Sequence, residues 1–251
     1  MKKNTLFIAT FFITTVLLTG ILLMAIPLKS EANKPRIRLL HDWEPGLIID
    51  ETDVNMTGLN RLFLVCDIDN NMWERINGKS WRKGCPVGRR ELCYLRLLHR
   101  NAKGQIQTGE MVVNRKIAER VTSIFKELYL QNYRIESIFL VDNYGGDDEK
   151  SMAANNTSCF NYRRVEGSAK LSKHAYGMAI DINPKYNPYV RGKKVSPENG
   201  RKYAFNREVR KDIPYEIDRN DMAYKLFTKA GATWGGNWKT MKDYQHFQFP
   251  S

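Results

Sequence analysis

The sequence predicts a single α+β domain that runs from about residue 55 to the end of the chain. Strand-like and helix-like segments are mixed in it without the regular alternation that a parallel sheet with crossover helices requires. The chain has 251 residues, of which 42% are hydrophobic and 27% charged, and this is enough for one globular core. No internal repeat is visible. We therefore expect a small antiparallel sheet packed against helices.

Apolar and aromatic runs predict the strands. They are residues 62–66, 92–98, 135–141 and 244–249. A turn signal at 101–104 follows the second run. In the last run, Phe247 and Phe249 alternate with His246 and Gln248, so the two pairs should face opposite sides of the sheet.

Two segments have the period of a helix. The first begins near Asn114, a plausible N-cap, and carries apolar residues from Ile117 to Leu128 at helical spacing. The second covers about 221–230 and is stopped by Gly231. Residues 142–158 read as a polar loop. The stretch 184–214 is long, polar and rich in Pro and Gly, and loops of that length are usually functional or mobile.

The first 32 residues have the pattern of an export signal. Lys2 and Lys3 precede an uncharged apolar run over residues 5–28. The run is also long enough to span a bilayer, so membrane association through residues 5–28 is an alternative to cleavage after Ala32. We expect an exported protein, in the periplasm or cell envelope. Residues 33–54 read as a linker or N-terminal arm, and residues 55–251 as the domain.

Charge and cysteine content narrow the class of partner. The formal net charge of +13 favours anionic partners, and export argues against nucleic acid among them. We expect a monomer. The four cysteines, an even number in an oxidising compartment, suggest disulfides, and Cys85 with Cys93 is the first pairing to expect.

Three residues in two short motifs predict a catalytic zinc site. His174 and Asp181 lie in one motif and His246 in the other, almost at the end of the chain. Catalytic zinc usually has three protein ligands drawn from histidine and carboxylate, and its fourth position is left for water. Strand alternation lets Asp181 and His246 project from rigid strands, and Gly177 permits the turn between His174 and Asp181.

Asp243, three residues before His246, is the predicted general base. Zinc lowers the pKa of a bound water toward about 7, so a nearby carboxylate suffices to take its proton. The same carboxylate can pass that proton to a leaving amine. Of the other two histidines, His99 is predicted to be structural and His41 exposed.

The two motifs resemble those of a known family. The pattern Ser-x-His-x-x-Gly-x-Ala-x-Asp over 172–181, followed by Asp-x-x-His over 243–246, is similar to the zinc D-Ala-D-Ala peptidases and L-alanyl-D-glutamate endopeptidases of the M15 class. The likeness extends to Trp-Gly-Gly-Asn-Trp at 234–238 and to residues 155–163. These enzymes act on peptidoglycan.

The resemblance implies roles for named residues. One Zn²⁺ ion would be bound by His174, Asp181 and His246, with Asp243 as the catalytic acid and base. Ser172 would line the substrate site, and Arg163 would polarise the scissile carbonyl or bind a substrate carboxylate, with Arg164 as a competitor for that role.

Aromatic residues and departures from the family pattern bear on specificity. Tyr176 and Trp238 could shape the substrate cleft. Asp243 stands where the dipeptidase branch has Glu, and Asn237 and Gln248 stand where acids are common in the endopeptidase branch. The sequence therefore leaves open which peptide bond is cut.

The leading hypothesis is a zinc peptidase that hydrolyses the stem peptides of peptidoglycan, as a D,D-carboxypeptidase or an L-Ala-D-Glu-type endopeptidase. The alternative is a non-catalytic, zinc-containing module that binds the cell wall, as Hedgehog signalling domains keep the fold and zinc for binding. Retention of Asp243 argues against it, because a binding module needs no base. A third possibility is a scaffold with structural zinc, but such sites normally have four protein ligands.

Overall fold

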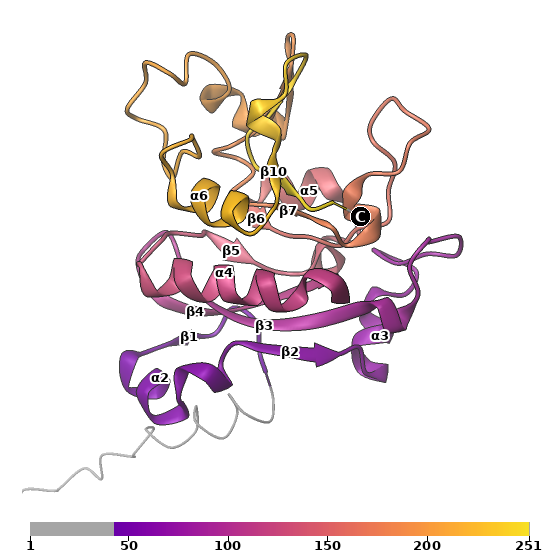
Figure 1. Ribbon diagram of the computed structural model, residues 1–251, viewed down its shortest axis with the longest axis vertical. Helices are drawn as coiled ribbons and strands as arrows, with labels where there is room; N and C mark the ends of the chain where they lie inside the picture. The colour runs from indigo at the N-terminus through magenta and orange to yellow at the C-terminus, as the bar shows by residue number, and fades with distance from the viewer. Residues whose placement is uncertain (1–42, 251) are drawn as a thin grey trace, which may run out of the picture. The chain divides into compact units, whose positions relative to one another are not determined.

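A computed structural model describes residues 43–250, which mix helices with small, mostly antiparallel sheets (Figure 1). The expected signal or anchor over residues 1–32, the first part of the arm and His41 lie outside the described residues. Within residues 43–250, no helix combines the length and apolar character needed to cross a membrane. The described part of the chain has the α+β architecture that the sequence predicts.

A four-stranded antiparallel sheet forms the N-terminal half, in the order β1-β4-β3-β2. Its strands are β1 (Ile48–Ile49), β2 (Leu64–Asp67), β3 (Leu92–Arg100) and β4 (Ile106–Asn114). The long β3–β4 hairpin turns at the predicted signal over 101–104. Two short helices accompany the sheet, α2 (Glu51–Thr57) and α3 (Asn70–Ile76). β1 and the start of α2 fall within 33–54, so the structure places regular elements at the end of the range expected as an arm.

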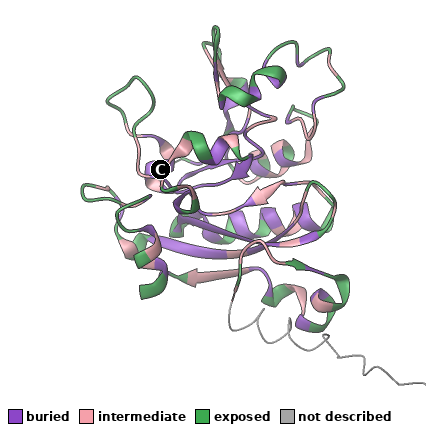
Figure 2. Cartoon of the chain, turned by 180° about the vertical axis from the view of Figure 1, so that it is seen from behind, coloured by how far each residue is buried: buried purple, intermediate pink, exposed green. Residues whose placement is uncertain are grey.

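Helix α4 (Ala118–Leu130) joins the two halves of the core. It follows a 3₁₀ turn, η4 (Arg115–Ile117), whose N-cap is Asn114, the residue predicted to start the helix. Its apolar stripe is buried, as Figure 2 shows, and packs against β3 on one side and α6 (Met222–Lys229) on the other. The rings of Phe125 and Phe227 meet edge to face at 6.3 Å. This core supports the C-terminal sheet.

The C-terminal half contains two small antiparallel sheets. The first has the order β10-β12-β7 and consists of β10 (Thr233–Trp234), β12 (His246–Gln248) and β7 (Ala179–Asp181). The second has the order β11-β8-β9 and consists of β11 (Lys242–Asp243), β8 (Tyr189–Arg191) and β9 (Lys194–Ser196). In the first sheet His246 lies directly opposite Asp181, while Phe247 and Phe249 are buried in the core.

Two segments differ from the sequence-based expectation. The run predicted as a strand over 135–141 forms only β5 (Ser137–Ile138), because its partner β6 (Asn156–Thr157) is equally short. The polar stretch 142–158 is not all loop, since it contains β6 and helix α5 (Asp148–Ala153), which Asp147 caps. The stretch 184–214 holds the β8–β9 hairpin and a 3₁₀ segment, η7 (Glu198–Tyr203).

The predicted disulfide between Cys85 and Cys93 is not formed. All four cysteines of the chain lie in the described part, and all are free thiols. Cys93 points from β3 into the main core, whereas Cys85 packs against a second apolar cluster that includes Leu92 and Tyr94. Alternation along β3 assigns those neighbours to the opposite face of the sheet, so the short sequence separation does not bring the two sulfurs together.

Candidate metal centre

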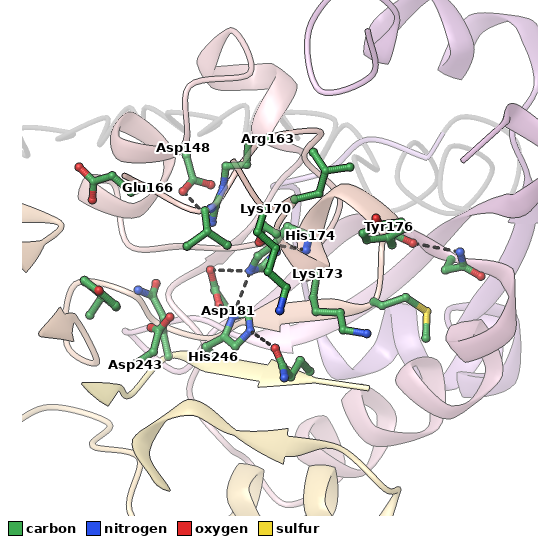
Figure 3. A pocket seen from close by; sticks show the side chains of 18 of the residues that line it. Asp148, Arg163, Glu166, Lys170, Lys173, His174, Tyr176, Asp181, Asp243 and His246 are labelled. Atoms are coloured by element: carbon green, nitrogen blue, oxygen red, sulfur yellow. Dashed lines mark hydrogen bonds and ion pairs between the residues drawn. The ribbon is translucent and has the colours of Figure 1, made fainter. Parts of the chain in front are cut away.

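A cleft of about 850 Å³ gathers the residues that the sequence singled out. Figure 3 shows the cleft with His174, Asp181 and His246 at its centre and Asp243 beside them. Its lining includes all eight candidate residues, namely Arg163, Ser172, His174, Tyr176, Asp181, Trp238, Asp243 and His246. Residues from distant parts of the chain therefore meet at one site.

His174, Asp181 and His246 form a compact, buried group. The two carboxylate oxygens of Asp181 each approach one imidazole, with Oδ2 3.1 Å from Nε2 of His174 and Oδ1 2.9 Å from Nδ1 of His246. The two facing ring nitrogens are 3.1 Å apart. One potential ligand atom from each residue lies within 4.8 Å of the others, so the three could hold one metal ion.

Local structure explains how the chain builds this group. Asp181 and His246 are register partners on β7 and β12, which fixes their side chains next to each other. His174 lies on a 3₁₀ turn, η6 (Lys173–Tyr176), whose N-cap Ser172 accepts a hydrogen bond from the His174 backbone. The turn ends at Gly177, with φ of 64°, where a Cβ would lie 2.7 Å from the backbone nitrogen of Asn114. Only glycine fits this position without strain.

Asp243 has the environment of a proton-transfer group. One of its carboxylate oxygens, Oδ1, is buried and has no hydrogen-bond partner among the described residues. Burial, reinforced by the charge of Asp181, raises the pKa of Asp243 to about 6, against the opposing effect of the imidazoles and Arg163. Gly235 makes this placement possible, since a Cβ there would lie 2.6 Å from the Asp243 carbonyl. The need for close approach accounts for a glycine in the 234–238 motif.

The charges of the central group are coupled. Burial alone would raise the pKa of Asp181, but the charge and hydrogen bonding of His174 and His246 outweigh it and hold the pKa well below its usual range. For His246, burial opposes protonation, yet the hydrogen bond to Asp181 raises its pKa above the ordinary value. The carboxylate thus remains ionised and draws positive charge to the site.

Arg163 lines the cleft and forms an ion pair that the sequence did not reveal. Its guanidinium lies 2.9 Å from the carboxylate of Asp148 on α5, as Figure 3 shows. The Arg163 Nε is buried and has no hydrogen-bond partner among the described residues. Arg164 does not line the cleft and instead donates to the Ala169 carbonyl within its own loop. Asp148 carried no recognisable signal, because it lies in a stretch that reads as a polar loop.

Three lysines also line the cleft and were missed. Lys170 and Lys173 come from the segment that leads to His174, and Lys116 comes from η4. Among the acids that line it, Asp148 pairs with Arg163, Glu166 pairs with Lys194, and Glu91 accepts from the backbone of Gly88. The scattered lysines gave no pattern in the sequence, and only the fold brings these three together.

The remaining predicted residues shape the walls of the cleft. Trp238 lies with its ring 5.4 Å from the imidazole of His246. Tyr176, at the end of η6, is half-buried and its carbonyl accepts from the Asn114 side chain. Ser172 is buried and caps the turn that carries His174, so it contributes to the placement of that imidazole as well as to the cleft.

The donor set fits zinc. Two imidazoles and one carboxylate are the ligands of a catalytic zinc site with three protein ligands. Each imidazole also has an acceptor on its outer nitrogen, which is the Cys159 carbonyl for His174 and the Gln248 amide for His246. Such outer partners are a regular feature of histidines that bind metals.

Comparison with known proteins gives one family match, which covers part of the chain. Residues 166–249 match the family model described as D-alanyl-D-alanine carboxypeptidase. No curated protein and no solved structure gives a significant match. The match covers His174, Asp181, Asp243 and His246, and it confirms the resemblance drawn from the two motifs. Residues 166–249 are therefore similar in sequence to the M15 family of peptidases.

Proposed function

We propose that the protein is a zinc-dependent peptidase that hydrolyses the stem peptides of peptidoglycan. The observation that carries this proposal is the buried His174–Asp181–His246 group beside Asp243, whose carboxylate has an unpartnered oxygen. His174, Asp181 and His246 would hold one zinc ion. When bound, zinc supplies Lewis acidity to the scissile carbonyl and lowers the pKa of an attacking water.

Asp243 would move the proton. With a pKa of about 6, its carboxylate is mostly ionised near neutral pH and can accept a proton from the attacking water. The protonated carboxyl group can then donate that proton to the nitrogen of the leaving amine. A single residue therefore serves as base and then as acid, in a pocket where its Oδ1 is committed to no other hydrogen bond.

Arg163 would stabilise negative charge that develops on the substrate. A guanidinium donates several hydrogen bonds in one plane, which suits a carboxylate or the oxygen of a carbonyl under attack. The ion pair with Asp148 holds the Arg163 side chain at the cleft. Asp148 is accordingly proposed as a positioning residue for Arg163.

The lysines favour an acidic substrate. Lys116, Lys170 and Lys173 line the cleft, while three of its acids are engaged in the interactions described above. Peptidoglycan stem peptides carry free carboxylates, which can pair with these ammonium groups. Export, expected from residues 1–32, would bring the protein to this substrate. The masses of the digestion products would distinguish a carboxypeptidase from an endopeptidase.

The test is digestion of purified peptidoglycan by the zinc-loaded full-length protein, with mass spectrometry of the products. Asp243→Asn and a chelated sample are the inactive controls, and Asp67→Asn is the matched control, because Asp67 is an exposed aspartate on β2. We expect new fragments from wild type and Asp67→Asn only. Loss of terminal residues would identify a carboxypeptidase, and internal cleavage an endopeptidase. Zinc binding and wall binding without any cleavage would instead support a binding module.

A further inference from the structure

The two imidazoles of the metal centre present different nitrogens to its interior. His174 faces Asp181 with Nε2, at 3.1 Å, whereas His246 faces it with Nδ1, at 2.9 Å. A ring nitrogen can bind a metal only through its lone pair, so its hydrogen must be carried by the other nitrogen. The centre therefore requires opposite tautomers at the two histidines.

The backbone fixes the tautomer of His174. Its Nδ1 lies 2.6 Å from the carbonyl oxygen of Cys159, which can only accept a hydrogen bond. Nδ1 must then carry the hydrogen, and Nε2 keeps its lone pair. No side chain is needed for this contact, and the Cys159 carbonyl lies in a buried part of the core.

A side chain performs the equivalent task at His246. Its Nε2 lies 3.2 Å from Oε1 of Gln248, an amide oxygen that can only accept. Gln248 is two residues further along β12, so both side chains project from the same face of the strand. The strand is held on both sides, by β10 and β7, which keeps the distance between the two side chains fixed.

We propose that Gln248 is a positioning residue of the metal centre, which holds His246 in the Nε2–H tautomer so that Nδ1 is free to bind the metal. The inference rests on the metal function proposed above and extends it to a residue outside the ligand set. Gln248 is half-buried and lines the cleft, so its amide can be exchanged without opening the core.

Two substitutions separate the hydrogen bond from the bulk of the side chain. Gln248→Leu keeps a similar volume but removes the acceptor, and Gln248→Glu keeps an acceptor at the same reach. Gln131→Leu is the matched control, because Gln131 is an exposed glutamine just after α4. The zinc dissociation constant of each full-length protein is measured by competition with a chromophoric chelator. Proton NMR of the zinc-loaded proteins detects the His246 Nε2–H, which exchanges slowly with water only when it is hydrogen-bonded.

We expect Gln248→Leu to weaken zinc binding by about 10- to 100-fold, as is usual when an outer partner of a ligand is lost. The slowly exchanging Nε2–H signal should disappear in that variant. Gln248→Glu and Gln131→Leu should bind zinc within about threefold of wild type, or more tightly in the case of Glu, and should retain the signal.

Two results would overturn the inference. One is a Gln248→Leu protein that binds zinc within about twofold of wild type. The other is an equal loss in Gln248→Leu and Gln248→Glu, which would point to packing and not to the hydrogen bond. If wild type itself fails to bind zinc, the proposed metal function fails. If wild type binds zinc and one of the two results above is found, only the role of Gln248 fails, so the two failures are distinguishable.

Discussion

Glu110 in the N-terminal sheet and Asp181 in the C-terminal sheet are both buried carboxylates, and their surroundings differ. The two oxygens of Glu110 accept hydrogen bonds from the Arg75 guanidinium at 2.8 and 2.6 Å, and Tyr94 donates another at 3.0 Å. Asp181 contacts two imidazoles, at 3.1 and 2.9 Å. The nearby carboxylate of Asp243 adds a second negative charge to the group.

The two carboxylates differ in whether the protein alone satisfies them. Glu110 has a permanent cation and a complete set of donors, so the fold itself neutralises it. The group around Asp181 contains two carboxylates and two imidazoles that are cationic only when protonated. The charge of Arg163 also acts on the carboxylates, but this guanidinium is paired with Asp148, and one oxygen of Asp243 has no partner among the described residues. On the proposed function, a divalent cation would complete the second arrangement, whereas the first needs nothing more.

The largest effect is expected at Asp243. Asp243→Asn removes the proton acceptor without removing a metal ligand, so hydrolysis should fall by about 10²- to 10⁴-fold while zinc stays bound. Steady-state rates on a defined stem peptide, with zinc content measured on the same samples, check this. An Asn variant that keeps more than about a tenth of the activity would show that Asp243 is not the base.

Asp181→Asn should separate metal binding from folding. Losing this ligand should weaken zinc binding by more than about 100-fold. The metal-free protein should also lose some stability, because the contacts of Asp181 with the two imidazoles outweigh the cost of burying its charge. By contrast, wild type at a free zinc concentration a thousandfold above its dissociation constant should gain about 4 kcal/mol, whereas Asp181→Asn, with an affinity at least about 100-fold lower, should gain at most about 1.4 kcal/mol. Urea unfolding with and without chelator measures both.

Glu110→Gln should give the opposite result. The substitution breaks the ion pair between the buried Glu110 and the partly exposed Arg75, and we expect the free energy of unfolding to fall by about 1 to 2 kcal/mol. Zinc affinity and the rate of hydrolysis, measured on the protein that remains folded, should stay within about twofold of wild type. A large loss of zinc affinity in Glu110→Gln would contradict the division between a structural and a functional carboxylate.

The smallest effect concerns pH and lies in the N-terminal sheet. Burial lowers the pKa of His99 to about 4, while its Nδ1 lies 2.8 Å from the Ile135 carbonyl. Between about pH 6.5 and 4 the unfolded chain binds a proton that the native protein does not, so stability falls as the pH falls. His99 alone should remove about 1 kcal/mol between pH 7.5 and 5.5.

His99→Gln tests this, since it cannot titrate in that range. The difference in stability between pH 7.5 and 5.5, from urea unfolding, should be smaller in His99→Gln than in wild type. Equal differences in the two proteins would show that His99 does not set this part of the pH dependence.

Local patterns predicted the centre of the site and part of the fold. The alternation around His246 and the spacing from His174 to Asp181 depend only on neighbouring residues, and the structure places these side chains together. The stripe of α4 and the capping role of Asn114 are local as well.

Long-range pairing could not be predicted in the same way. Asp148 meets Arg163, and Lys116 joins the cleft, only after distant segments pack together. The same limit explains the disulfide error, because sequence separation does not report which face of β3 a cysteine occupies. Gln248 stood out as a departure from the family pattern, but only the structure shows its contact with His246.

The most direct test of the account is zinc-edge X-ray absorption on the purified full-length protein, together with its zinc stoichiometry. We predict one zinc ion per chain, bound only through nitrogen and oxygen, with the scattering signature of two imidazoles. The thiol of Cys159 is buried near Asp181. If this thiol bound the zinc ion, the absorption spectrum would show a sulfur ligand. A sulfur atom in the coordination shell, or the absence of stoichiometric zinc, would contradict the assignment of His174, Asp181 and His246 as the metal ligands.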